Sequence, residues 1–182
     1  MSYFPFFREI EGEKCLVIGG GKVAARKISR LKEFGVKIKV VAPSIVSDIE
    51  AMAQACDNIS VERRIITPQD IENADFVIAA AGEEADKEAA RLCKERSIPV
   101  NVVDNQELCD FIFPSIIRKG DMVAGFVTGG KSPHVAAKIR RDCEMNISDN
   151  IEDILDYLAR IRKLAKDRIS DERKRAAYIR EV

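Results

Sequence analysis

The chain has 182 residues, and its 30 Lys and Arg are balanced by 30 Asp and Glu. This length suits one ordinary core with appended segments, and the even charge balance argues against a nucleic-acid partner. No apolar run approaches the roughly 18 residues that span a bilayer. The five cysteines never occur in C-x-x-C spacing, and His134 is the only histidine. We therefore expect a cytoplasmic protein without a disulfide framework, a histidine metal cage or a membrane segment.

Strand-like and helix-like segments alternate along the first 113 residues. Short apolar runs rich in β-branched residues are typical of buried parallel strands, and small or apolar residues at helical spacing follow them. The expected strands are 15–18, 36–42, 59–63, 76–81 and 99–103, and the expected helices are 23–34, 47–56, a short one from 68, and 84–96. Repeated alternation of this kind predicts an α/β domain over 1–113, with a parallel, Rossmann-like sheet.

Three glycines connect the first strand to the first helix. With Ala24 in the last position, Gly19-Gly20-Gly21-Lys22-Val23-Ala24 fits the dinucleotide fingerprint G-x-G-x-x-G/A. Glycines allow the sharp turn and the close approach of a pyrophosphate, and the helix N-terminus attracts phosphate groups. A glycine-rich turn that binds no ligand is the alternative for this segment taken alone.

Several other segments end at the carboxyl edge of the predicted sheet, where doubly wound proteins bind their ligands. The expected cofactor-binding positions are Gly19, Gly20, Gly21, Lys22, Val23, Ala42, Pro43, Ser44, Ala80, Ala81 and Val103. The acidic residue that the fingerprint usually places at the end of the second strand is missing, but no Arg or Lys lies between Val40 and Glu62 to receive a 2′-phosphate. We therefore expect the cofactor to be NAD rather than NADP.

The pattern changes over residues 114–147. Two strands around Gly120 predict a β-hairpin, and Ser132 followed by Pro133 predicts the cap and first position of a helix. Six basic residues against three acidic ones give this segment a local charge of +3. The excess favours an anionic substrate held by Gly129, Gly130, Lys131 and Ser132. A solvated helix face and a purely structural cap are the alternatives.

The last part, 148–182, is expected to be helical. Its first helix carries one apolar face, made of Ile151, Ile154, Leu155, Leu158, Ile161 and Leu164, and a second helix begins near Ser170. A hairpin and helices of this size cannot bury their apolar faces alone. We therefore expect a homodimer whose interface includes 114–147.

Five stretches together resemble the precorrin-2 dehydrogenase family of siroheme synthesis, which includes the N-terminal half of bifunctional siroheme synthases. They are CLVIGGGKVAARK, VVAP, VNVVD, FIFPSIIRKG and TGGKSPHVAAKIRR, in family order and over essentially the whole chain. At Ala80-Ala81-Gly82 many relatives have threonine in the third place, so we expect one hydroxyl contact to the cofactor to be absent. The fused methyltransferase of the longer enzymes does not occur in this sequence, so we expect no use of S-adenosylmethionine.

The resemblance implies oxidation of precorrin-2 to sirohydrochlorin, with NAD as hydride acceptor, in a homodimer. Some members also insert ferrous iron to give siroheme, so iron is a candidate second substrate. The eight carboxylates of this tetrapyrrole fit the basic segment 114–147. A non-catalytic NAD-binding sensor domain and a chelatase without dehydrogenase activity are the alternatives.

Asp104 is the expected catalytic residue. It follows the strand VNVVD at the ligand-binding edge, and its position matches the one to which the family assigns the role of base. The reaction releases a proton as well as a hydride, and carboxylates are among the usual proton acceptors. A plain turn residue is the alternative for Asp104, and His134 is the competing base.

Overall fold

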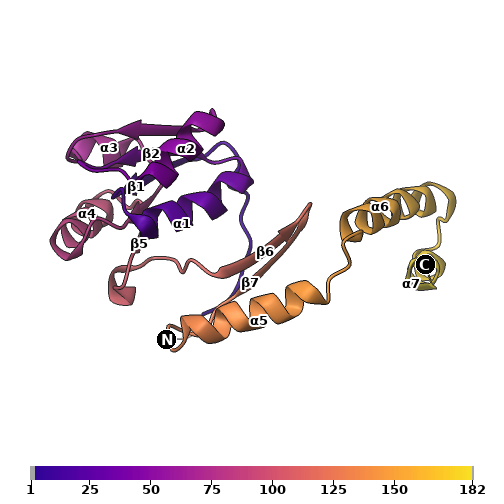
Figure 1. Cartoon of the computed structure of the whole chain (residues 1–182). Coiled ribbons are helices and arrows are strands. Elements are labelled where there is room, and N and C mark those ends of the chain that lie inside the picture. Colours follow the sequence, from indigo (N-terminus) through magenta and orange to yellow (C-terminus); the bar gives the residue numbers. More distant parts are fainter. Residues whose placement is uncertain (1–2, 182) are drawn as a thin grey trace. The chain divides into compact units, whose positions relative to one another are not determined.

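The structure is a computed structural model that describes residues 3–181. The chain divides between Phe113 and Pro114 into two compact units (Figure 1). Among residues 3–181, no helix is both long and apolar enough to cross a membrane.

The first unit is built on a five-stranded sheet in which every neighbouring pair of strands is parallel. The strands are β1 (Lys14–Ile18), β2 (Lys37–Val41), β3 (Ile59–Glu62), β4 (Phe76–Ala79) and β5 (Val100–Val102), in the order β3-β2-β1-β4-β5. The prediction of a parallel, doubly wound sheet is confirmed. The strand order reverses at β1, because β2 lies on one side of it and β4 on the other, and ligands of such sheets bind at this reversal.

Helices cover both faces of this sheet, and the side chains of β1 show how. Cys15 and Val17 join a core with α1 (Lys22–Leu31) and α2 (Ser47–Ala55). Leu16 and Ile18 point to the other face and join a core with α3 (Pro68–Glu72) and α4 (Glu83–Glu95). Two short 3-10 turns, Lys32–Phe34 and Gln106–Leu108, complete the unit. The strands read as continuous apolar runs because both of their faces are buried.

Four of the five strands are shorter than the sequence predicts, and side chains explain where β4 ends. Ala80 still donates to the carbonyl of Ile18 at 2.7 Å. The amides of Ala81 and Gly82 instead donate to the carboxylate of Asp86, at 2.8 and 3.2 Å. The expected strand 76–81 therefore stops at Ala79, because a side chain takes the donors that a longer ladder would use. The other three strands lose one or two residues: 36–42 becomes Lys37–Val41, 59–63 becomes Ile59–Glu62, and 99–103 becomes Val100–Val102.

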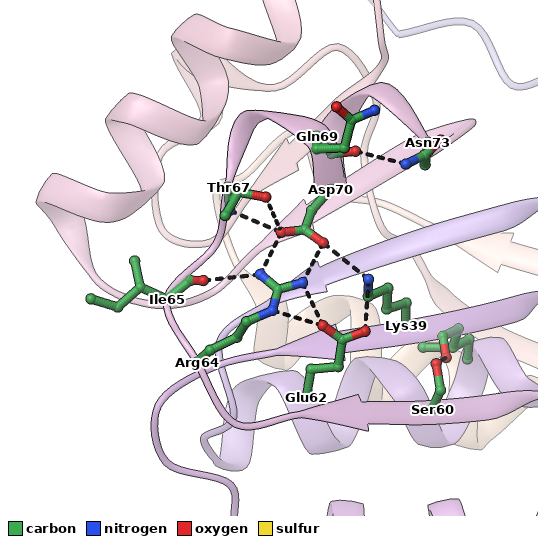
Figure 2. A network of polar contacts seen from close by, with 10 residues as sticks. Lys39, Ser60, Glu62, Arg64, Ile65, Thr67, Gln69, Asp70 and Asn73 are labelled. Carbon is green, nitrogen blue, oxygen red and sulfur yellow. Dashed lines mark hydrogen bonds and ion pairs between the residues drawn. The ribbon is translucent and has the colours of Figure 1, made fainter.

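A network of charged groups holds the connection from β3 to α3 (Figure 2). The carboxylate of Asp70 is nearly buried and accepts both arms of the Arg64 guanidinium, at 2.6 and 2.7 Å. It also accepts the ammonium of Lys39 at 3.0 Å and the backbone N–H of Thr67 at 2.9 Å. Hydrogen bonding from Arg64, the largest contribution, holds the pKa of Asp70 well below its usual range. Thr67 and Asp70 form a reciprocal capping box at the start of α3, with Pro68 as its first residue.

The second unit begins with the expected hairpin, β6 (Ser115–Lys119) and β7 (Met122–Phe126), which pair antiparallel around Gly120. Helix α5 (Pro133–Met145) packs against both strands, and α6 (Ile151–Arg168) packs against α7 (Glu172–Glu181). The apolar stripe expected on α6 stays partly in solvent, since Ile154 is 43% and Leu164 is 49% exposed.

Candidate functional site

The first unit brings its predicted cofactor-binding positions to one edge of the sheet. They follow the carboxyl ends of β1, β2, β4 and β5. The backbone ties these ends together, since Gly19 N donates to Val41 O at 3.1 Å and Val103 N donates to Ala79 O at 2.9 Å. Parallel order is what collects residues from such distant parts of the chain at a single edge.

The three glycines of the turn have different reasons to be glycine. A Cβ on Gly19 would lie 2.2 Å from the carbonyl oxygen of Ala80, and Gly19 has a φ of +114°. A Cβ on Gly20 would lie 2.1 Å from the carbonyl oxygen of Ser44. A Cβ on Gly21 would meet nothing within 4 Å. The fold therefore needs Gly19 and Gly20, whereas the missing side chain of Gly21 leaves room for a group from outside the chain.

Of the helices α1, α2 and α4, α1 is the best suited to an anion. Its N-cap, Gly21, has no side-chain capping bond, and its first turn contains no acidic residue. The N–H groups of Lys22 and Val23 point out of the first turn without helical partners. In contrast, α2 has Asp48 and Glu50 in its first turn. Asp86 already accepts the amides that precede α4. The residues at α1 fit the pyrophosphate of a dinucleotide.

The segment after β2 lies beside the glycine turn. Val46 N donates to Gly20 O at 2.9 Å, so the loop that carries Ala42, Pro43 and Ser44 is fixed against the turn. Ala42 is buried, whereas Pro43 and Ser44 are exposed. The hydroxyl of Ser44 is thus available at the place where such folds bind ribose.

Asp104 stands at the end of β5 in an unusual backbone conformation. Its φ of +59° is left-handed, a region that Asp and Asn tolerate better than other residues with side chains. The residue is exposed. Its charge acts on two neighbours, Lys27 of α1 and Asp86 of α4. Burial, with a smaller contribution from Asp104, raises the pKa of Asp86.

Three residues of this edge carry no prediction from the sequence: Asp86, Lys27 and Asn101. The carboxylate of Asp86 accepts the backbone N–H groups of Ala81 and Gly82, between β4 and α4. Lys27 donates to the buried side chain of Asn101 at 2.8 Å. Asp86 lies four residues after Gly82, at a place where acidic side chains are common near helix N-termini, which is a usable signal. Lys27 and Asn101 are 74 residues apart, so no local pattern could connect them.

The predicted substrate-binding positions lie in the second unit, on the turn from β7 to α5. Gly129 and Gly130 both have left-handed backbone, with φ of +61° and +79°. Ser132 caps α5, because its hydroxyl accepts Val135 N at 3.3 Å. Thr128 supports the turn by accepting Ser132 N at 3.2 Å and donating to Ser132 O at 2.9 Å. Lys131 is exposed, so its charge and the N-terminus of α5 are open to an anion.

A cavity of about 650 Å³ lies elsewhere in the first unit, near the amino-terminal halves of β1, β2 and β3. Lys14, Lys37, Asn58 and Asp70 are among the residues that line it. None of the predicted site residues lines it. Within residues 3–181, no group of three or more His, Cys, Asp or Glu side chains is placed to hold a metal ion.

Comparisons with known proteins agree with this geometry. Residues 6–115 match the family model described as "Putative NAD(P)-binding". The chain is 35% identical over 179 residues to the siroheme synthase of Nitrosomonas eutropha, an alignment that covers 98% of this chain and 38% of that protein. It is 39% identical over 145 residues to the siroheme synthase of Thioalkalivibrio sulfidiphilus, covering 79% of this chain and 29% of that protein. The chain thus spans about two-fifths or less of these relatives.

A solved structure described as "SirC, precorrin-2 dehydrogenase" has the same fold. It superposes with a TM-score of 0.76 at 21% identity, over 98% of this chain and 88% of that chain. The fold and the glycine turn define a Rossmann-type dinucleotide-binding protein. The chain belongs to the putative NAD(P)-binding family, and the resemblance to siroheme synthases expected from its sequence is confirmed.

Proposed function

We propose that the chain oxidises precorrin-2 to sirohydrochlorin, with NAD as hydride acceptor. The observation that carries the proposal is that the uncapped glycine turn at Gly21 and the exposed carboxylate of Asp104 lie at one edge of one sheet. Similarity to siroheme synthases supports the substrate class. A non-catalytic NAD sensor would have no use for a carboxylate beside the cofactor.

Different residues of the first unit bind the cofactor and accept the proton in the proposed oxidation. The first turn of α1 holds the pyrophosphate, and Ser44 donates to or accepts from a ribose hydroxyl. When bound, NAD supplies a hydride acceptor. Precorrin-2 loses two hydrogens, one as the hydride and one as a proton, and the carboxylate of Asp104 accepts the proton. Because Asp104 is exposed, the proton can then pass to water.

The substrate has many carboxylates, and we propose that the β7–α5 turn binds one of them. Lys131 and the N-terminus of α5 provide positive charge, and the left-handed Gly129 and Gly130 shape the turn. Ser132→Asp separates this role from capping, because Asp also caps helices well but adds a negative charge. Tetrapyrrole binding should weaken about tenfold while the melting temperature is kept. Unchanged binding would leave Ser132 as a cap alone.

NAD is proposed over NADP because no Arg or Lys lies between Val40 and Glu62 to receive a 2′-phosphate, and the two arginines that follow Glu62 are already paired. Arg64 is bonded to Asp70 and Glu62, and Arg63 is paired with Glu50 of α2. A 2′-phosphate needs an unshared Arg or Lys beside the ribose. Isothermal titration should show tighter binding of NAD than of NADP. Tighter binding of NADP would contradict the assignment, and Arg63→Gln would then identify the cation responsible.

The experiment that tests the proposed function is an anaerobic assay with precorrin-2, the whole chain and NAD. We expect sirohydrochlorin and NADH to form together and in equal amounts, and neither to form without NAD. Binding of NAD without oxidation would instead support the sensor alternative. Ferrous ion added afterwards tests whether siroheme forms, the second reaction that the family resemblance implies, with Asp104 assisting.

A further inference from the structure

Lys27 joins three parts of the first unit through one ammonium group. It lies on α1, six residues after Gly21, and its Nζ donates to Asn101 Oδ1 on β5 at 2.8 Å. The same Nζ lies 4.4 Å from the centroid of the Phe113 ring, a cation–π contact. Asn101 is 5% exposed, and its Nδ2 donates to Phe111 O at 2.9 Å. The helix, the strand and the segment that leaves the strand are therefore fastened at one point.

These contacts lie at the two ends of the turn that carries Asp104. The turn follows β5, and the chain then runs back beside the strand. Asp110 accepts Val100 N on its carboxylate at 3.0 Å and donates its own N–H to Val100 O at 2.9 Å. The two ends of the turn are thus β5 and the segment 109–113. Lys27 contacts both ends, through Asn101 and Phe113.

A lysine at this position has a desolvation cost, which its contacts with Asn101 and Phe113 must offset. Burial lowers the pKa of Lys27 to about 8, which means that the surroundings disfavour its charge. The charged and titratable groups that act on it are Cys109, Arg26 and Asp104. Arg26 lowers the pKa further, whereas Cys109 and Asp104 raise it. A methionine of similar length would avoid burying a charge, but it would leave the buried Oδ1 of Asn101 without this donor.

We propose that Lys27 is a positioning residue for Asp104: held between Asn101 and Phe113, its ammonium fixes the catalytic turn to the helix that binds the dinucleotide. The inference rests on the proposed function, because it assigns Lys27 to that same site. It does not give Lys27 a contact with the substrate. The expected consequence is that loss of the ammonium lowers turnover and leaves NAD affinity nearly unchanged.

The test compares Lys27→Met, Lys27→Arg and a control, Arg30→Met, which removes an exposed cation from the same helix. Lys27→Met should oxidise precorrin-2 about tenfold to a hundredfold more slowly, because misplacement of a catalytic group by about 1 Å has effects of that size. Its dissociation constant for NAD should change less than about threefold. Lys27→Arg should recover most of the rate. Equal rates for Lys27→Met and Arg30→Met would overturn the inference.

A pH profile separates positioning from mere packing. Wild-type turnover should fall as the pH rises through about 8, because Lys27 loses its proton there. Lys27→Arg stays charged and should not show this fall. The same fall in Lys27→Arg would overturn the inference, and this comparison still decides it if Lys27→Met does not fold.

Hydrogen exchange distinguishes failure of the inference from failure of the proposed function. If the wild-type chain does not oxidise precorrin-2, the proposed function is wrong, but the link through Lys27 is still measurable. Amides of 100–113 should then exchange faster in Lys27→Met than in Arg30→Met. Equal exchange in the two variants would show that Lys27 does not hold the segment 100–113 in place.

Discussion

The two units differ in where their apolar side chains go. In the first unit Ile28, Val40 and Ile78 are fully buried between sheet and helices. In the described part of the second unit, Ile117, Ala136 and Ala165 are the only buried apolar residues. Large apolar side chains on its surface include Val127, Val135, Ile139, Met145, Tyr157 and Leu164. The sheet and helices of the first unit enclose a core of their own, although Phe4, Phe6 and Phe7 before β1 are exposed. The hairpin and helices of the second unit bury few apolar residues and leave much apolar surface exposed.

The two units also present different chemical groups. The first unit presents backbone N–H groups and one carboxylate from a sheet that is held on both faces. The second presents a basic turn on a hairpin and helix with little core of their own. We propose that a second copy of the chain covers this unit, since symmetric dimers are the commonest assemblies. The following predictions test how far this division holds, from the largest expected effect to the smallest.

Asp104→Asn should separate catalysis from folding within the first unit. Asn keeps the shape and tolerates the left-handed φ of +59°, but it cannot accept the proton. Turnover should fall by about two to four orders of magnitude, with NAD affinity nearly intact. The measurement is the steady-state rate of precorrin-2 oxidation beside an isothermal titration with NAD. A rate close to wild type would make Asp104 a turn residue and His134 the next candidate.

Ile139→Glu should break the proposed dimer without disturbing the first unit. Ile139 is 42% exposed on α5, and a carboxylate there would be buried unpaired in an interface. The dissociation constant of the dimer should rise at least about thirtyfold, which corresponds to about 2 kcal/mol. Light scattering over a range of concentrations measures it. The matched control is Ile65→Glu, since Ile65 is 75% exposed in the first unit. A wild-type chain that is monomeric at micromolar concentration would refute the dimer.

Gly21→Ala and Gly20→Ala should affect different properties: the first should lower NAD affinity, and the second should lower stability. A Cβ at Gly21 meets no protein atom within 4 Å, so the fold should persist while NAD affinity falls about tenfold. A Cβ at Gly20 would clash with Ser44 O, so that variant should lose about 1–3 kcal/mol of stability. Thermal melting and NAD titration of both variants measure the difference. Equal loss of stability in the two variants would show that Gly21 serves only the fold.

Acid should destabilise the first unit through the network around Asp70. The pKa of Asp70 is held well below its usual range, chiefly by Arg64. The stabilisation is therefore complete above the ordinary carboxyl pKa of about 4 and is lost as the pH falls below it. The melting temperature should drop by about 2–4 °C for each kcal/mol lost. Asp70→Asn should start lower and show a smaller drop between pH 5 and 3. An equal drop in the variant would assign the acid sensitivity to other groups.

Much of the fold follows from local patterns, and for that reason the sequence predicts it. Apolar runs mark strands whose two faces are both buried, as at Val77 and Ile78. Thr67 with Pro68 and Ser132 with Pro133 mark helix starts, and Gly35 marks a helix end with its left-handed φ of +69°. These signals act within a few residues, so they need no knowledge of distant contacts.

Only part of the candidate site follows from such local patterns. The fingerprint and the parallel order place the cofactor positions at one edge, but they do not say which glycine the ligand needs. That distinction depends on Ser44 and Ala80, which come close to Gly20 and Gly19 only after the sheet has formed. The end of β4 at Ala79 depends in the same way on Asp86 reaching back from α4.

By itself, the sequence determined the succession of strands and helices along the chain, the helix caps and a dinucleotide as the class of cofactor. Each of these rests on residue type and short-range spacing. The tertiary structure decided which helix N-terminus stays open, how Lys27 meets Asn101 across 74 residues, and how Asp104 comes near Lys27 and Asp86. Long-range contacts of this kind leave no periodic trace in the chain. They exist because parallel strands that are far apart in the sequence end side by side at one edge of a sheet.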